Sequence, residues 1–227
     1  MALATWWRGD PLPPLPKLDN FFAEKSDKEP ILARLTGLDT NEIRARLQAG
    51  HRPYLGYLAG EPVAYGWLAT HQAAIGELGL DFNLPARHRY LWDFATLPAW
   101  RGRGIYPHLL QAILQNQIQQ ADYFWIIYAP ENRPSGAGIR KAGFSTVGLL
   151  SLHRTGRPGL TPQGDKKRAG AGADLLGVPL LVNGLSPCWH CGGAAYPAPP
   201  HSITCSCGST FKPVMLPRQA SCLCVAA

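Results

Sequence analysis

The chain has 227 residues, of which 46% are hydrophobic and 16% charged, and its formal net charge is +7 at pH 7. This length accommodates one medium domain and a small appendage, and the composition is that of a soluble globular protein. The basic balance favours polyanionic partners such as nucleic acid or a phosphorylated cofactor, although a well-solvated basic surface explains it equally. The best apolar run, Leu175–Leu185, is too short and too interrupted for a membrane span, so we expect no membrane partner. Residues 1–16 lack the pattern of a secretory signal, which favours a cytoplasmic protein.

The first 30 residues carry Trp6, Trp7 and a Pro-rich run from Pro11 to Pro16. We expect this segment to be extended and packed on the domain by its tryptophans, with a polyproline ligand for a partner as the alternative. Apolar residues at helical spacing then predict helices between Ile31 and Gly50, the second of them capped by Asp39 or Thr40.

The alternation of strand and helix patterns from residue 31 to residue 153 predicts one α/β domain with a mixed sheet. Its first elements are a hairpin of Tyr54–Ala59 and Pro62–Ala69 and an extended pair of Ile75–Leu84 and Tyr90–Thr96. A helix over 107–120 and a strand over Tyr123–Ala129 follow. The domain ends with a short helix over 133–142 and one or two strands over 144–153. Short links between strand, helix and strand imply a right-handed parallel crossover.

Beyond this domain the composition changes twice. Residues 154–177 are rich in glycine and include Lys166-Lys-Arg168, which predicts a basic linker. Residues 178–215 contain two cysteine pairs at a spacing typical of a closed tetrahedral site for structural Zn²⁺, so we expect a small zinc ribbon there, followed by a tail over 216–227. The four predicted ligands are Cys188, Cys191, Cys205 and Cys207. Cys222 and Cys224 lie outside this set, as free thiols, a second incomplete metal site or part of a prenylation box.

The most informative segment runs from Thr96 to Tyr106 and contains Arg101-Gly-Arg-Gly104. A strand ends, the chain turns through two glycines, and an amphipathic helix begins, so successive backbone N–H groups converge at the positive end of the helix dipole. A pyrophosphate suits this position, and Arg101 and Arg103 add charge for further phosphate groups.

This turn resembles the signature of the GNAT superfamily of acyl-CoA N-acyltransferases, Arg/Gln-x-x-Gly-x-Gly/Ala. Arg101 and Gly104 match the signature, whereas Tyr106 replaces its last small residue, so its ring must leave the cofactor path or line the acceptor pocket. The segment from Glu131 to Phe144 is similar to the later Asn-x-x-Ser…Lys-x-Gly-Phe segment of that family. The resemblance covers residues 30–153 and implies a GNAT-like mixed sheet.

The resemblance also implies a binding site for acetyl-CoA or another acyl-CoA. In that family two parallel strands, here Tyr90–Thr96 and Tyr123–Ala129, splay apart and hold the pantetheine arm, with hydrogen bonds to the backbone near Ala95 and Thr96. The Asn after the second strand, here Asn132, commonly contacts the cofactor, and capping of the following helix is its alternative role. The phosphate-binding residues would be Arg101, Gly102, Arg103, Gly104, Ile105 and Tyr106.

Acylation of an amine needs a base, and Asp93 is the best candidate because many family members carry a carboxylate near this strand end. Its alternative role is an ion pair with Arg87 or Arg89, and Glu77 and Asp81 are weaker candidate bases. The tyrosine that often serves as general acid in the family is replaced here by Ile139. Tyr128 or Tyr106 would substitute for it, unless the thiolate leaves without a dedicated acid.

Three functions are therefore compatible with the sequence. The first is an enzyme that moves an acyl group, most simply acetyl, from CoA to an amine that the sequence does not specify. The second is an acyl-CoA-binding regulatory module with little or no turnover, which the departures at Tyr106 and Ile139 motivate. The third is a zinc-ribbon protein that binds nucleic acid or a protein partner.

Overall fold

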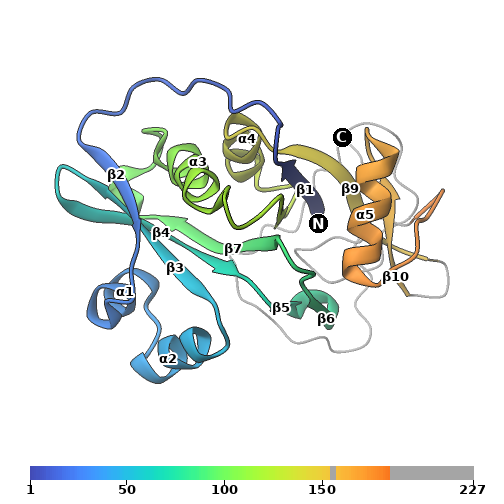
Figure 1. The fold of residues 1–227 in the computed structure, drawn as a ribbon, viewed down its shortest axis with the longest axis horizontal. Helices are drawn as coiled ribbons and strands as arrows, with labels where there is room; N and C mark the ends of the chain where they lie inside the picture. The colour runs from blue at the N-terminus through green and yellow to red at the C-terminus, as the bar shows by residue number, and fades with distance from the viewer. Residues whose placement is uncertain (154–156, 185–227) are drawn as a thin grey trace. The chain divides into compact units, whose positions relative to one another are not determined.

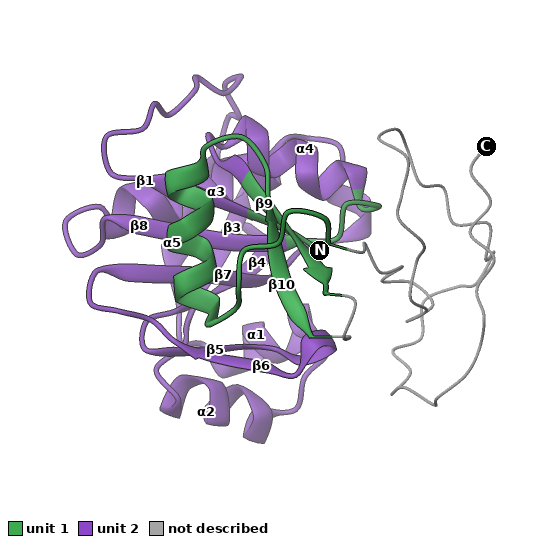
Figure 2. Cartoon of the chain, turned by 90° about the vertical axis from the view of Figure 1, so that its right-hand side faces the viewer, with its two compact units in different colours: residues 1–3, 128–132, 147–227 green, residues 4–127, 133–146 purple. Residues whose placement is uncertain are grey.

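The computed structural model describes residues 1–153 and 157–184 (Figure 1). These residues divide into two compact units (Figure 2): residues 1–3, 128–132 and 147 onward form unit 1, and residues 4–127 and 133–146 form unit 2. The predicted zinc ligands Cys188, Cys191, Cys205 and Cys207 lie outside the described residues, as do Cys222 and Cys224. None of the helices in the described part of the chain is both long and apolar enough to cross a bilayer.

Unit 2 contains four α-helices, and they are α1 (Glu29–Thr36), α2 (Thr40–Gln48), α3 (Ile105–Gln117) and α4 (Arg133–Lys141). Helix α2 begins after Asp39, one of its two predicted N-caps. The side chain of Asp39 accepts hydrogen bonds from the backbone N–H groups of Asn41 at 2.8 Å and Glu42 at 2.9 Å, which satisfies two donors of the first turn. Gly37, at φ 73°, ends α1 in the left-handed conformation that favours glycine.

The sheet of unit 2 has the strand order β1-β8-β7-β4-β3-β2. The strands are β1 (Ala2–Trp7, in this unit from Ala4), β2 (Phe21–Lys25), β3 (Arg52–Leu58), β4 (Glu61–Ala69), β7 (His88–Thr96) and β8 (Tyr123–Tyr128, in this unit to Ile127). β2, β3, β4 and β7 are joined by antiparallel pairs, and β7 and β8 are parallel. The predicted hairpin around residues 60–61 and the parallel crossover through α3 are both confirmed.

The helices cover the two faces of this sheet separately. α3 and α4 lie on one face, and α1 and α2 lie on the other (Figure 1). On the α1–α2 face, β3 and β4 pack against the helices through buried apolar and aromatic residues, namely Leu32, Leu35, Ile43, Leu55, Tyr57, Tyr65 and Trp67. The sheet is thus fixed from both sides, which positions the carboxyl end of β7.

Two segments differ from the expectations. The strand expected over 75–84 does not pair with the strand at 90–96. Residues 72–83 instead form a separate hairpin of β5 (Gln72–Ile75) and β6 (Leu80–Asn83) with a 3₁₀ turn (Gly76–Leu78) between them. Residues 2–7 are a strand, β1, whose Trp6 is 1% exposed, so the N-terminus joins the sheet as well as packing on it. Trp6 Nε1 also donates a hydrogen bond to the carbonyl of Pro11 at 3.3 Å.

Unit 1 contains β9 (Ser145–Leu152, in this unit from Val147), β10 (Pro158–Pro162) and α5 (Lys166–Leu176). β9 and β10 are an antiparallel pair. Helix α5 occupies a stretch that was expected to be a linker, and its start is set by Asp165, whose side chain accepts from the N–H groups of Lys167 and Arg168. Gly177, at φ 63°, ends the helix. The three alanines of the helix and its cap compensate for the glycines that suggested a linker.

A β-bulge interrupts the pairing of β4 with β7. Tyr65 lies opposite Ala95 and Trp67 lies opposite Trp92, so two residues of β7, Asp93 and Phe94, face the single residue Gly66. Asp93 takes the extra position with φ 50°, in the left-handed region. A Cβ atom on Gly66 would lie 2.0 Å from the ring of Phe94. Glycine is therefore required at position 66 because the Phe94 ring lies directly over its backbone.

We expect Gly66→Ala to lower the free energy of unfolding by about 1–3 kcal/mol, the usual cost of forcing an extra methyl group into a packed site. Urea unfolding measures this change. The matched control is Gly76→Ala, where an added Cβ meets nothing within 4 Å and the expected change is within about 0.5 kcal/mol. Equal losses in the two variants would contradict the packing of Phe94 on Gly66.

Candidate active site

The turn between β7 and α3 has the geometry expected of an anion site. After Thr96 the chain makes a 3₁₀ turn (Pro98–Trp100), and Gly102 and Gly104 both take φ 79° in the left-handed region. Gly104 is the N-cap of α3, so no side chain caps the first N–H groups of this helix. These groups, at the positive end of a helix of 13 residues, are open to an anionic ligand.

The two arginines of the turn have different anchors. Arg101 Nε donates a hydrogen bond to the carbonyl of Thr96 at 3.0 Å, which ties the turn back to the end of β7. The guanidinium of Arg103 lies 4.8 Å from the centroid of the Trp100 ring, within the range of a cation–π contact. Both side chains belong to exposed residues. The turn therefore presents two positive charges to solvent beside the start of α3.

β7 and β8 separate before they end. Their parallel register runs from the pair of His88 and Tyr123 to the pair of Leu91 and Ile126 and stops there, whereas β7 continues to Thr96. The stop coincides with the bulge at Asp93 and Phe94, which adds local twist to β7. Within unit 2, the side of β7 that faces β8 has backbone groups beyond Leu91 that make no ladder pair with it. This open strand side leads to the glycine turn.

Tyr106, the departure from the family signature, is turned away from the glycine turn. Its ring packs on α4, where a Cβ on Gly138 would lie 2.5 Å from it, and its centroid is 5.6 Å from that of Phe94. Burial raises the pKa of Tyr106, and a hydrogen bond with Ser135 opposes this shift. Tyr106 stands where the family signature has a small residue, and its ring fits because position 138 is a glycine. Ile139, at the position of the frequent family tyrosine, is fully buried.

Asp93, the candidate base, is paired with α2 rather than with Arg87 or Arg89. Its Oδ2 lies 2.5 Å from Nη1 of Arg46, and its Oδ1 lies 3.5 Å from the hydroxyl of Tyr65. Arg87 binds Asp122, and Arg89 binds Gln117 and two backbone carbonyls, so the expected ion pair with either arginine does not form.

Tyr65 was not singled out by the sequence, because it lies on another strand, 28 residues before Asp93. Burial raises the pKa of Tyr65 to about 12, and the neighbouring Asp93 carboxylate adds to this rise. The hydroxyl is therefore protonated at neutral pH and acts as a hydrogen-bond donor. A group with so high a pKa is a poor proton donor to a thiolate, whose conjugate thiol has a pKa near 8.5.

A cavity of about 230 Å³ lies on unit 2 between the end of α2 and the β5–β6 hairpin. It is lined by Ala49, His51, Gln72, Ala73, Ala74 and Asp81. The ring of His51 packs edge-on against Trp92, the residue before Asp93, at a centroid distance of 5.1 Å. Burial lowers the pKa of His51, and the charge of Arg46 lowers it further, so this side chain is neutral at pH 7. Three of its lining residues, Gln72, Ala73 and Ala74, belong to β5.

The structure brings together only some of the predicted site residues. Asp93, Ala95, Thr96 and residues 101–106 share unit 2 and follow one another along β7, the turn and α3. Tyr128 and Asn132 belong to unit 1, where the backbone N–H of Asn132 donates to the carbonyl of Ala129 at 2.9 Å. Glu77 is exposed in the 3₁₀ turn, and Asp81 lines the cavity beside His51.

Comparison with known proteins identifies the family. The sequence model described as the Acetyltransferase (GNAT) family matches residues 17–144, more than half of the 227 residues. No curated protein sequence matches the chain.

Three solved structures are similar to parts of this one. A GNAT-family protein from Novosphingobium aromaticivorans has 15% sequence identity and a TM-score of 0.44, over 63% of this chain and 59% of that one. A GCN5-related N-acetyltransferase from Kribbella flavida has 17% identity and a TM-score of 0.43, over 64% and 53% of the two chains. An aminoglycoside acetyltransferase from an uncultured soil sample, in complex with sisomicin, has 13% identity and a TM-score of 0.42, over 55% and 88%. The chain thus spans less than two thirds of the first and second of these proteins.

The contact of Tyr106 with Gly138 is testable by stability. Alanine is normally favoured over glycine inside a helix by about 0.5–1 kcal/mol, so an exposed site would gain stability from Gly→Ala. At position 138 we expect the opposite, a loss of about 1–2 kcal/mol in urea unfolding, because the added Cβ overlaps the Tyr106 ring. In a Tyr106→Ala background the same substitution is expected to be neutral or stabilising. The same loss with and without the ring would exclude this packing.

Proposed function

The chain belongs to the acetyltransferase (GNAT) family, and from this premise we propose that it transfers an acetyl group from acetyl-CoA to an amine. The observation that carries the proposal is the glycine turn at the uncapped N-terminus of α3, with Arg101 and Arg103 beside it. Backbone N–H groups of residues 102–106, together with the side chain of Arg101, would bind the pyrophosphate, because no side chain caps the start of α3 and the positive end of its dipole lies there. The open side of β7 at Ala95 and Thr96 would bind the amide groups of the pantetheine arm.

The path of the cofactor explains two features of the site. The arm must pass along β7 from the turn toward the bulge, so the thioester would reach the level of Asp93. The Tyr106 ring leaves this path free because it packs on Gly138 instead. Asn132, which follows β8, is proposed as a further contact of the cofactor, and its side chain belongs to an exposed residue.

Asp93 is proposed to take the proton of the acceptor ammonium, directly or through a water molecule. The nitrogen lone pair then attacks the thioester carbonyl, and the tetrahedral intermediate loses the second nitrogen proton to solvent and expels the CoA thiolate. A thiolate is a good leaving group, so this step needs no dedicated acid. For protonation of the thiolate once it has left, the proposed donor is Tyr128, since Tyr106 is held by Ser135 and α4 and Tyr65 is too weak an acid.

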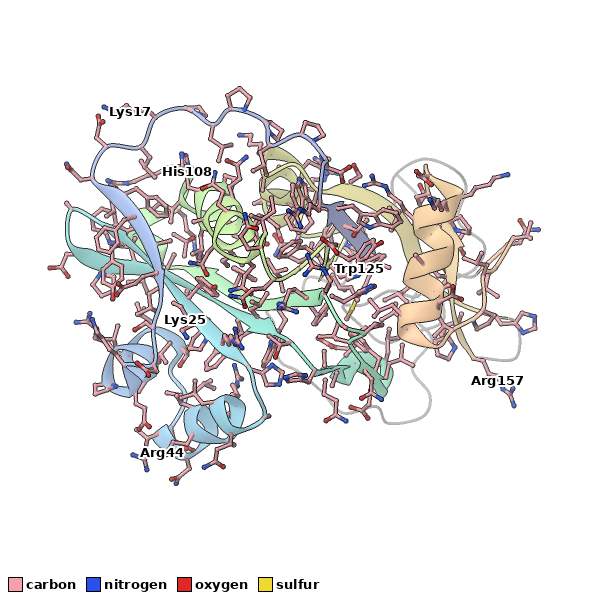
Figure 3. The ribbon with its side chains drawn as sticks, viewed as in Figure 1. Lys17, Lys25, Arg44, His108, Trp125 and Arg157 are labelled. Carbon is pink, nitrogen blue, oxygen red and sulfur yellow. The ribbon has the colours of Figure 1, made fainter. Side chains whose placement is uncertain are left out.

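We expect the double variant Arg101→Glu/Arg103→Glu to weaken acetyl-CoA binding by about tenfold or more, because charge-assisted contacts to phosphate are replaced by repulsion. Isothermal calorimetry on the full chain measures the dissociation constant. The control is Lys17→Glu/Lys25→Glu, which changes the net charge equally at two exposed lysines labelled in Figure 3. Equal weakening by both double variants would show that only the net charge matters, and absence of acetyl-CoA binding by the unaltered chain would refute the proposal.

We expect Asp93→Asn to reduce kcat by about 10²–10⁴-fold, the usual contribution of a general base, with the Kd of acetyl-CoA unchanged. The assay follows release of the CoA thiol from acetyl-CoA with a panel of polyamines, aminoglycosides and peptide N-termini. Full activity in Asp93→Asn would remove Asp93 from the mechanism. Binding of acetyl-CoA without turnover of any amine would favour the alternative function, a regulatory acyl-CoA-binding module.

A further inference from the structure

The partner of Asp93, Arg46, comes from a different element and is held from several directions. Nη1 of Arg46 lies 2.5 Å from Asp93 Oδ2, and Nη2 lies 3.1 Å from Glu42 Oε1, one helical turn earlier on α2. The guanidinium carbon is 4.6 Å from the ring centroid of Trp92 and 5.1 Å from that of Trp67. The Arg46 side chain is only 17% exposed. Aromatic faces and two carboxylates therefore fix the guanidinium in one place.

This arrangement constrains the carboxylate of Asp93. The residue occupies the extra position of the bulge, and its own side chain is 31% exposed, so the strand alone does not fix its direction. Arg46 takes Oδ2, and the remaining oxygen, Oδ1, lies 3.5 Å from the protonated hydroxyl of Tyr65. One oxygen is thus engaged by a short ionic contact, and the other keeps capacity for a proton or a water molecule.

The ion pair of Arg46 with Asp93 is not needed to hold α2 in place, because α2 has other contacts. α2 already has an ion pair with α1, in which Arg44 lies 2.8 Å from Glu29 on the outer surface. α2 also buries Ile43 in the core of this face. A second surface ion pair would not require a guanidinium that lies over the adjacent rings of Trp67 and Trp92 and contacts the candidate base.

We infer that Arg46 is a positioning residue for acyl transfer. It holds the Asp93 carboxylate by Oδ2, so that Oδ1 is directed to receive the proton from the acceptor ammonium. Arg46 neither gains nor loses a proton in this step. One proton passes from the acceptor ammonium to Oδ1, the nitrogen lone pair forms the new bond to the acetyl carbon, and the carbon–sulfur bond of the thioester breaks to release the CoA thiolate. The inference rests on the proposed function, with Asp93 as the base. It makes α2, which also borders the cavity at Ala49, part of the machinery that sets the rate of acyl transfer.

The test compares Arg46→Ala, Arg46→Lys and Arg46→Met with Arg44→Ala as the matched control on the same helix. Turnover is measured as CoA thiol release from acetyl-CoA with the best amine of the panel described above. We expect Arg46→Ala to lower kcat by about tenfold or more while KM for acetyl-CoA stays within about twofold. Arg46→Lys, which keeps the charge but loses the planar fork, is expected to fall between Arg46→Ala and the unaltered chain. Arg44→Ala is expected to keep full activity.

Chemical rescue separates positioning from structural support. Methylguanidinium at millimolar concentration should restore part of kcat in Arg46→Ala, because it can occupy the vacated space over the Trp67 and Trp92 rings beside Asp93, whereas methylammonium and urea should not. No rescue is expected in Arg46→Met, whose side chain fills the space, or in the double variant Arg46→Ala/Asp93→Asn. If Arg46→Ala does not fold, as judged by its thermal unfolding, Arg46→Met carries the comparison with Arg44→Ala.

The results distinguish a failure of the Arg46 inference from a failure of the proposed acyltransferase function. Unchanged kcat in the Arg46 variants, together with a large loss in Asp93→Asn, would overturn the positioning role and leave the proposed base intact. Equal losses of kcat and stability in the Arg46 variants and in Arg44→Ala would show that the pair is only structural. Inactivity of the unaltered chain and of Arg44→Ala toward every amine would refute both the inference and the proposed function.

Discussion

One extra residue in β7 decides how this site is built. Between the pair of Trp67 and Trp92 and the pair of Tyr65 and Ala95, β7 has two residues where β4 has only Gly66. The insertion reverses the alternation of side chains along β7. Trp92 and Ala95, three residues apart, both pack on the α1–α2 face, whereas Phe94 contacts Tyr106 on the opposite face. Asp93 takes the extra position and reaches α2. The pairing of β7 with β8 ends at the same point.

The bulge and the glycine turn have complementary effects on the backbone. The bulge leaves one side of β7 unpaired with β8 beyond Leu91, and the turn leaves the first N–H groups of α3 without a side-chain cap. Open backbone donors are costly when they are buried but suit a ligand that carries amides and phosphates. Arg101 joins the two features through its hydrogen bond to the Thr96 carbonyl. Residues 93–106 thus provide a continuous polar track from the candidate base to the phosphate-binding turn.

Local signals in the sequence were enough to predict most of the fold that supports this track. Asp39 caps α2 as expected, because an Asp before a helical pattern satisfies N–H groups two and three residues ahead. The strand, turn and helix around Gly102 and Gly104 were likewise predicted from residues that adjoin one another. The β5–β6 hairpin and α5 were missed, since a 3₁₀ turn within an extended stretch and a glycine-containing helix both give weak local patterns.

Contacts between distant residues could not be predicted from one sequence. Arg46 lies 47 residues before Asp93, and nothing local distinguishes it from Arg44, which pairs with Glu29 on the surface. Asp93 pairs with neither Arg87 nor Arg89, although both are near it in the sequence. Arg89 does point to the α3 face, where it binds Gln117, but the bulge directs Asp93 to α2 instead. Only the register of β4 against β7 reveals this change.

Hydrogen–deuterium exchange in the presence and absence of CoA tests the central claim most directly, because it reports on backbone N–H groups without the need for a known acceptor. The account predicts that saturating CoA slows exchange in peptides covering residues 92–106, which include the end of β7 and the start of α3. Peptides covering β2, an edge strand away from this track, should be unaffected. Unchanged exchange over 92–106 at a CoA concentration that saturates binding would contradict the account.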